Sequence, residues 1–318
     1  MKRITFKQAM SIVVAELRDN GRWGTAHIYQ ATTRSFLSFL QSDSLLLCRI
    51  TPALLKAYEE HLRQQGRQWN TISTYLRTLR ALYNRGVDRK WAPVAPRLFE
   101  HVYTGTRVES KRALSAQEMS KVLRAAEACN SPLSTGSKQQ QQASLLFSLM
   151  FLLRGIPFVD LVYLRKEDYA GGVITYRRRK TGRLLSVVVP PEARRVIDAF
   201  RSLNPSSPYL LPLMQGMGDS EQRYREYQSL LRHLNQSLKL LGRELGLTSS
   251  LSSYAARHTW ATMAYYCEIH PGIISEAMGH SSITVTETYL KPFRDERIDE
   301  ANKQVIAFVR REGRTKRA

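Results

Sequence analysis

The chain has 318 residues, of which 43% are hydrophobic, and this is enough apolar material for one or two ordinary cores. Lys and Arg number 48 against 27 Asp and Glu, so the net charge of +21 argues against a routine acidic metabolic enzyme and favours a polyanionic partner. The longest apolar run, Ser144–Leu153, is too short to cross a bilayer, and the three cysteines are scattered without zinc or disulfide spacing. We therefore expect a cytoplasmic, nucleoid-associated protein that binds nucleic acid and needs no cofactor or metal ion.

The first hundred residues carry the pattern of short amphipathic helices. A capping box at Thr5–Gln8 predicts the first helix, and aromatic and apolar residues between Tyr29 and Leu40 mark the second. Thr51–Gly66 predicts the third, with proline at its first helical position, and Asn70–Tyr83 predicts the fourth. Two prolines between Trp91 and Pro96 then end the helical pattern.

A polar and basic stretch separates this helical block from the rest of the chain. We interpret residues 104–112 as an interdomain linker, which leaves a small helical domain over 1–103 and a larger domain over 113–318. The fourth helix also shows three arginines outside its apolar stripe: Arg77, Arg80 and Arg85. They fit either a solvated helix face or a footprint on a DNA backbone, and the sequence leaves both interpretations open.

The larger block is predicted to be helical with one β-hairpin. A capping box at Ser115–Glu118 starts a helix, Asn130–Gln142 is expected to form a surface loop, and Leu145–Leu153 is expected to be a buried helix. The one clear strand pair is Val173–Tyr176 and Leu184–Val189, with a turn built from Lys180–Arg183. Further helices are expected after Pro190 and over Glu221–Leu245, Ser252–Tyr266, Gly272–Met278 and Arg294–Arg311.

Three segments of this block carry candidate chemistry: Tyr254–Thr262 (Y-A-A-R-H-T-W-A-T), Met278–Leu290 (M-G-H-S-S-I-T-V-T-E-T-Y-L) and Arg178–Gly182 (R-R-K-T-G). Motifs for nucleotide hydrolysis or metal binding, such as G-x-x-x-x-G-K and H-E-x-x-H, are missing. In type and order the three segments resemble the tyrosine recombinase (phage integrase) family, over roughly Ser115–Arg311. The R-G-x-x-F-V-D-L wording, which begins at Arg154, most resembles Bacteroides-type members.

The resemblance implies a mainly α-helical protein, with a small SAM-like core-DNA-binding domain before a larger helical catalytic domain that carries a small β-hairpin. It implies a site-specific recombinase that cleaves and rejoins double-stranded DNA through a 3′-phosphotyrosine intermediate, for integration, excision or inversion. The implied partners are duplex DNA, further copies of the chain in a homodimer or homotetramer that exchanges the helix Arg294–Arg311, and accessory DNA-bending proteins. The chain starts at the first helical domain, which favours a system without the arm-site domain of larger integrases.

The resemblance also assigns roles to individual residues. Tyr289 would attack the scissile phosphate, and Arg257 would hold two of its non-bridging oxygens, because a guanidinium is a planar fork of donors. His280 would donate a further hydrogen bond to the same oxygens. Lys180 would protonate the leaving 5′-oxygen. His258 is instead expected to be a packed, hydrogen-bonded histidine.

Two positions depart from the family pattern. Pro157 stands where the first catalytic arginine is expected. Arg154, one helical turn earlier, could deliver its guanidinium to the same place, or it could pair with Asp160 or extend to solvent. Tyr254 occupies the position of a histidine; it could bind a phosphate oxygen or be an ordinary core tyrosine, and the acceptor of the Tyr289 proton stays open.

Two other functions remain compatible with the sequence. A relaxing enzyme of the type IB topoisomerase kind would use the same chemistry without exchanging partner strands. A catalytically impaired, sequence-specific DNA-binding protein would retain the basic surface, and the departures at Pro157 and Tyr254 make this alternative worth testing.

Overall fold

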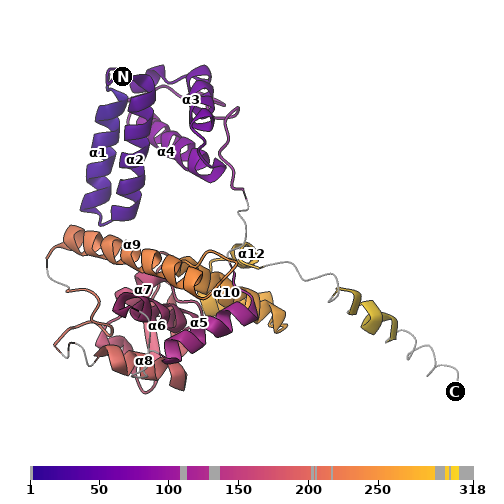
Figure 1. Ribbon diagram of the computed structural model, residues 1–318. Helices are drawn as coiled ribbons and strands as arrows, with labels where there is room; N and C mark the ends of the chain where they lie inside the picture. Colours follow the sequence, from indigo (N-terminus) through magenta and orange to yellow (C-terminus); the bar gives the residue numbers. More distant parts are fainter. Residues whose placement is uncertain are drawn as a thin grey trace. The chain divides into compact units, whose positions relative to one another are not determined.

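The computed structural model describes residues 3–107, 113–128, 137–201, 204, 206–215, 218–290, 298–300 and 302–307 (Figure 1). The chain divides into two compact units, Met1–Glu109 with Gly218–Tyr224 and Ser110–Met217 with Arg225–Ala318. The linker expected over 104–112 stays a prediction, because 108–112 lie outside the described residues. No helix in the described part of the chain combines the length and the apolar character that a bilayer crossing requires.

The first unit is a helical bundle, and its elements are α1 (Phe6–Asp19), α2 (Trp23–Leu40), η1 (Leu47–Arg49), α3 (Pro52–Gln64) and α4 (Trp69–Asp88). Thr5 and Thr51 cap α1 and α3 with their side-chain oxygens, so the local signals in the sequence are confirmed. Phe6, Phe36 and Tyr58 pack edge to face, with ring centroids 4.9 Å apart in each successive pair. The bundle therefore closes around an aromatic centre.

The arginines of α4 have different surroundings. Arg77 and Arg80 are exposed. Arg85 lies 3.7 Å from the carboxylate of Glu16, which also accepts two hydrogen bonds from Arg89, at 2.7 and 2.9 Å. Of these three arginines, Arg85 therefore lies beside a carboxylate, whereas Arg77 and Arg80 form no ion pair with Glu16.

The following elements along the chain are α5 (Ala116–Ala128), α6 (Lys138–Leu152), α7 (Phe158–Val162), η2 (Lys166–Asp168), α8 (Pro191–Arg201), α9 (Ser220–Glu244), α10 (Ser253–Tyr266), α11 (Pro271–Met278) and α12 (Ile283–Glu287). Residues 298–300 and 302–307 are also helical. The other residues of the predicted helix Arg294–Arg311 lie outside the described residues. The short helix α12 was not predicted. It matters for the site because Tyr289 lies two residues beyond its end.

The surface loop expected over Asn130–Gln142 is wrong for its last residues. Lys138–Gln142 forms the first turns of α6, while 129–136 lie outside the described residues. The physical reason is a capping box: the Ser137 side chain accepts from the Gln140 backbone N–H, and the Gln140 side chain accepts in return from Ser137. The glutamine run is thus helical, since straight-chain residues lose little rotamer freedom in a helix.

A small antiparallel sheet has the order β1 (Tyr169–Ala170), β2 (Val173–Arg177), β3 (Leu184–Val188). The predicted hairpin is confirmed, with Val173 opposite Val188 and Arg177 opposite Leu184, whereas the two-residue β1 was missed. At the closed end the Arg178 N–H donates to the Arg183 carbonyl at 2.8 Å. Gly182 adopts a φ of 71° there, a left-handed conformation that glycine reaches without strain.

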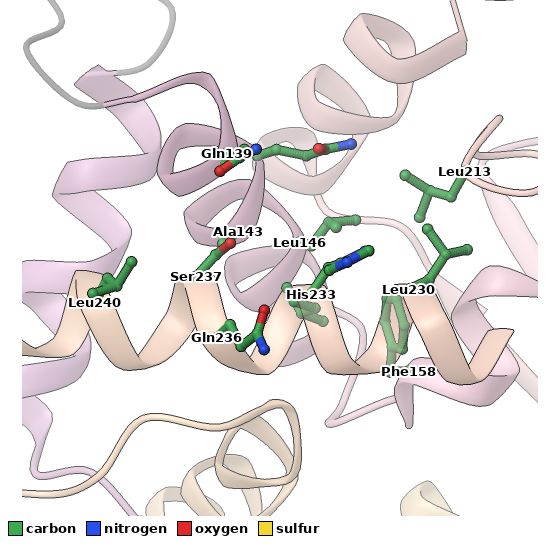
Figure 2. A pocket seen from close by; sticks show the side chains of 12 residues that line it. Gln139, Ala143, Leu146, Phe158, Leu213, Leu230, His233, Gln236, Ser237 and Leu240 are labelled. Carbon is green, nitrogen blue, oxygen red and sulfur yellow. The ribbon is translucent and has the colours of Figure 1, made fainter. Parts of the chain in front are cut away.

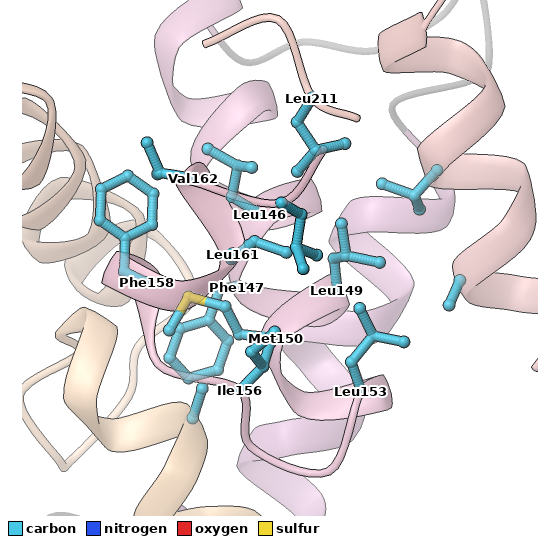
Figure 3. Close-up of a cluster of buried hydrophobic side chains, with 14 of the residues drawn as sticks. Leu146, Phe147, Leu149, Met150, Leu153, Ile156, Phe158, Leu161, Val162 and Leu211 are labelled. Atoms are coloured by element: carbon cyan, nitrogen blue, oxygen red, sulfur yellow. The ribbon is translucent and has the colours of Figure 1, made fainter. Parts of the chain in front are cut away.

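The hydrophobic core of the second unit lies around α6, as the apolar run predicted. Phe147, Met150 and Ile156 are at most 1% exposed, and Figure 3 shows them within one cluster of aliphatic and aromatic side chains. Ala255 and Ala256 of α10 are fully buried in the same core. Because their side chains are small, α10 lies close to α6, and this packing fixes the helix that carries Arg257.

Candidate active site

Four of the six predicted site residues come together in the second unit. Arg257 and Tyr254 lie on α10, His280 follows α11, and Tyr289 follows α12. Arg257, His280 and Tyr289 are 2%, 6% and 8% exposed, while Tyr254 is 46% exposed. The cluster thus joins residues that are up to 35 positions apart and opens to solvent on the side of Tyr254.

Backbone carbonyls hold the Arg257 guanidinium in place. One of its terminal nitrogens donates to the Gly155 carbonyl at 2.9 Å, and the other donates to the Met278 carbonyl at 2.6 Å. Gly155 has a φ of 68°, and a Cβ added there would lie 2.9 Å from the Arg257 Cα. Glycine at this position therefore permits the close approach of the 154–157 loop to α10 that gives Arg257 its first acceptor.

His280 is a neutral imidazole in this arrangement. Its Nε2 lies 2.8 Å from a terminal nitrogen of Arg257, and because a guanidinium only donates, Nε2 must accept. The proton is then on Nδ1, which donates to the Thr286 hydroxyl at 2.8 Å. Burial, and then the positive charges of neighbours beginning with Arg257, lower the pKa of His280 to about 3.

Tyr289 is enclosed by aromatic and cationic groups. Its ring stacks on His280 at a centroid distance of 4.9 Å and lies 4.6 Å from the ring of His258. The Arg257 guanidinium carbon lies 5.7 Å from the centroid of the Tyr289 ring. The Tyr289 hydroxyl is hydrogen-bonded to the hydroxyl of Tyr254. Burial of Tyr254, and next this hydrogen bond, raise the pKa of Tyr254 above its usual range.

The two remaining predicted residues lie elsewhere in the described structure. Lys180 is exposed in the hairpin turn, and no hydrogen bond or ion pair holds its ammonium among the described residues. Its charge nevertheless reaches the cluster, because it is one of the causes of the lowered pKa of His280. The Arg154 guanidinium donates to the Ser186 carbonyl on β3 at 3.2 Å, so its contribution to the site stays a prediction.

Sequence reasoning missed three buried groups beside this cluster. Arg178, counted only as part of a basic turn, is 6% exposed, and its Nε lies 2.8 Å from the Oδ2 atom of Asp160. Asp160 is 3% exposed and also accepts from the Arg179 backbone N–H at 2.9 Å, while Thr286 is fully buried. The alternation of β2 contains the missing signal, since Ile174 and Tyr176 face inward and residue 178 continues their period of two.

A separate cavity of about 370 Å³ lies between α6 and α9 (Figure 2). Leucine and glutamine side chains and His233 line it, and none of its lining residues belongs to the cluster around Tyr289. The cavity is therefore spatially distinct from the cluster around Tyr289.

Comparison with known proteins agrees with this arrangement. Residues 5–101 match the Phage integrase SAM-like domain, and residues 112–296 match the Phage integrase family. Tyrosine recombinase XerC of Halalkalibacterium halodurans is 23% identical over 275 residues, which cover 84% of this chain and 86% of that protein. The XerC of Rhizobium meliloti is 24% identical over 280 residues, 83% of this chain and 82% of its relative.

A solved lambda integrase dimer bound to a COC′ core site shares the fold. Its TM-score is 0.63 at 15% identity, over 90% of this chain and 95% of that chain. The fold and the family match define a tyrosine recombinase, an enzyme that transfers DNA strands. The chain belongs to the Phage integrase family, and it is a tyrosine-type site-specific recombinase that cleaves and rejoins DNA. The expected fold, mainly helical with a SAM-like domain and a small sheet, is confirmed.

Proposed function

We propose that Tyr289 is the nucleophile of this recombinase and that Arg257, His280 and Lys180 assist its attack on DNA. The observation that carries the proposal is the position of Tyr289, whose ring lies against His280 and below the Arg257 guanidinium. A phenol needs cationic neighbours to react near neutral pH, since its ordinary pKa is about 10.

The reaction joins the Tyr289 oxygen to the scissile phosphorus and breaks the bond from phosphorus to the 5′-oxygen. The phenol proton passes to solvent water on the open side of the cluster, and the 5′-oxygen takes a proton from the Lys180 ammonium. The products are a 3′-phosphotyrosyl ester and a free 5′-hydroxyl. Because one phosphodiester replaces another, attack by a 5′-hydroxyl of a second strand reverses the step without ATP.

Arg257 and His280 would act on the non-bridging oxygens. In the structure the Arg257 nitrogen that faces His280 is bonded to protein acceptors, and a phosphate oxygen is a stronger, charged acceptor for it. Once this donor turns to the phosphate, Nε2 of His280 is released. The phosphate charge raises the pKa of the imidazole, which then takes up a proton and donates to the same oxygens.

Tyr254 and Arg154 have supporting roles in this proposal. Because the pKa of Tyr254 is raised, its hydroxyl stays protonated and orients the Tyr289 oxygen rather than removing its proton. Arg154 is the first candidate for the arginine that Pro157 replaces. To reach the cluster it would have to leave the Ser186 carbonyl.

We also propose double-stranded DNA as the substrate and assembly into dimers and tetramers on it. The net charge of +21 supports a DNA partner, and lambda integrase is solved as a dimer on a core site and as a tetramer on a Holliday junction. A cytoplasmic, nucleoid-associated location, membership of the Bacteroides-type subgroup, exchange of the C-terminal helix and accessory DNA-bending proteins belong to the same proposal.

A nicked duplex tests the nucleophile directly. Mapping the DNA that flanks the gene for inverted repeats would supply candidate sites. A nick beside the scissile phosphate lets the short 5′-hydroxyl fragment diffuse away, so that the covalent complex accumulates. We expect this complex with the wild type and none with Tyr289→Phe. Tyr266→Phe is the matched control, since Tyr266 is a half-exposed tyrosine at the end of α10, and it should leave the complex unchanged.

Two results would contradict the proposal. Covalent complex formed by Tyr289→Phe would exclude this residue as the nucleophile. No complex from the wild type on a site that it binds would favour an impaired DNA-binding protein. Relaxation of supercoiled plasmid that lacks any specific site would instead favour the topoisomerase-like alternative.

A further inference from the structure

Arg178 is a buried cation that lies beside Arg257 of the proposed active site. Its Nε forms an ion pair with Asp160, and one terminal nitrogen donates to the Met278 carbonyl. Arg257 donates to that same carbonyl, so a single backbone oxygen is shared by both guanidinium groups. This shared acceptor lies two residues before His280.

The charges of this region do not balance among the described residues. Two buried guanidinium groups, Arg178 and Arg257, lie beside one buried carboxylate, Asp160. Burial, and then the charge of Arg178, lower the pKa of Arg257, which reports that the two cations repel each other. A buried cation without a counter-ion is costly, and an anion bound between the two groups would remove that cost.

Asp160, the ion-pair partner of Arg178, lies close in the sequence to Pro157, which stands where the family has its first catalytic arginine. Asp160 lies three residues beyond Pro157, on the short helix α7. Its Oδ2 atom forms the ion pair with Arg178, and its Oδ1 atom accepts from the Arg179 backbone N–H, so the carboxylate contacts both the side chain and the start of the hairpin turn. The other terminal nitrogen of Arg178 has no hydrogen bond to the described residues and is available to a ligand.

We propose that Arg178 is the second phosphate-binding arginine of this recombinase and replaces the arginine that Pro157 displaces, with Asp160 as its positioning residue. The inference rests on the proposed function, because it takes the scissile phosphate as the anion. Arg178 and Arg257 bind the non-bridging oxygens together and neutralise the charge that develops during attack by Tyr289. Arg154 then remains at the sheet, bonded to Ser186.

Single-turnover cleavage of the nicked duplex tests this assignment. We expect Arg178→Ala to slow cleavage about 100-fold or more, the usual effect of removing one transition-state donor, while DNA affinity changes only a few-fold. Arg178→Lys should not restore the rate, because an ammonium cannot bond Asp160, Met278 and a phosphate in one planar arrangement. Arg179→Ala, the adjacent residue whose guanidinium lies over Tyr163, is the matched control and should cleave within a few-fold of wild type.

A neutral phosphate separates a catalytic role from a structural one. A methylphosphonate at the scissile position has no negative charge on its non-bridging groups, so a charge-neutralising arginine becomes dispensable. The defect of Arg178→Ala should therefore shrink to about 10-fold or less on this substrate. An equal defect on both substrates, or loss of the thermal unfolding transition, would overturn the proposal in favour of a structural ion pair.

The competing assignment has its own outcome. If Arg154→Ala shows the large, charge-dependent defect and Arg178→Ala does not, Arg154 is the phosphate-binding arginine and the inference is wrong. A wild type that forms no covalent complex, or a Tyr289→Phe variant that does, would contradict the proposed function instead. The two failures are thus distinguishable in one set of assays.

Discussion

The two units of the protein place their arginines in opposite environments. Arg77 and Arg80 of α4 are exposed, whereas Arg178 and Arg257 are 6% and 2% exposed and bonded to protein acceptors. An exposed guanidinium stays hydrated and adapts to any phosphate, so it adds affinity that falls with salt. A buried guanidinium is held in one geometry at a cost in free energy, and this suits it to a single phosphate at which bonds are made and broken.

The largest expected effect concerns the glycine that holds the buried arginine in place. Gly155→Ala puts a methyl group 2.9 Å from the Arg257 Cα at a φ of 68°, so both strain and a backbone clash should destabilise the second unit by roughly 2 kcal/mol or more. Urea unfolding measures the loss of stability, and the cleavage rate measures its effect on the site. Gly171→Ala is the matched control, since Gly171 has a φ of 56° with open space around it and should show the strain alone. Equal losses in the two variants would argue against close packing at Gly155.

A smaller effect is expected at Thr286, which acts through His280. Thr286→Val removes the acceptor of the Nδ1 proton, and the imidazole can then adopt the tautomer that cannot accept from Arg257. We expect cleavage to fall about 10- to 100-fold. Thr286→Ser should restore most of the rate because it keeps the hydroxyl. A serine variant as slow as the valine variant would show that the Thr286 methyl group packs the core and that its hydroxyl is unimportant.

The smallest effect is expected in the exposed set. Arg77→Ala and Arg80→Ala should each weaken DNA binding a few-fold and lower the slope of log affinity against log salt by about 1. Cleavage at saturating protein should be unchanged. Arg85→Ala is the comparison variant, because Arg85 already lies beside Glu16. Unchanged affinity and slope in the first two variants would identify α4 as a merely solvated face.

Local signals predicted most of the secondary structure. The caps at Thr5 and Thr51 and the apolar run ending at Leu153 depend on neighbours within a few positions, and all three predicted helices are present. The Gln run is helical where its composition predicts a loop, because the capping box at Ser137 starts α6. Strand β1 was missed because two residues are too few to show an alternation.

The candidate site was predicted unevenly for a different reason. Tyr289, His280 and Arg257 occur in recognisable motifs, and the structure brings them into contact. The alternation of β2 indicates that Arg178 points inward, but it does not indicate that Arg257 lies on that side of the sheet. Only the tertiary structure shows that Arg178 meets Asp160 and the Met278 carbonyl, whereas Arg154 donates to the Ser186 carbonyl.

By itself the sequence determined the kinds of side chain available, the order of the helices and the motifs that mark the family. These depend on residue identity and on contacts within a few positions of the chain. The tertiary structure decided which cations are buried together, because Arg178 and Arg257 meet at the Met278 carbonyl from sequence distances of 100 and 21 residues. The contacts of a long, flexible side chain depend on the acceptors that folding brings within its reach, and these acceptors come from distant parts of the chain.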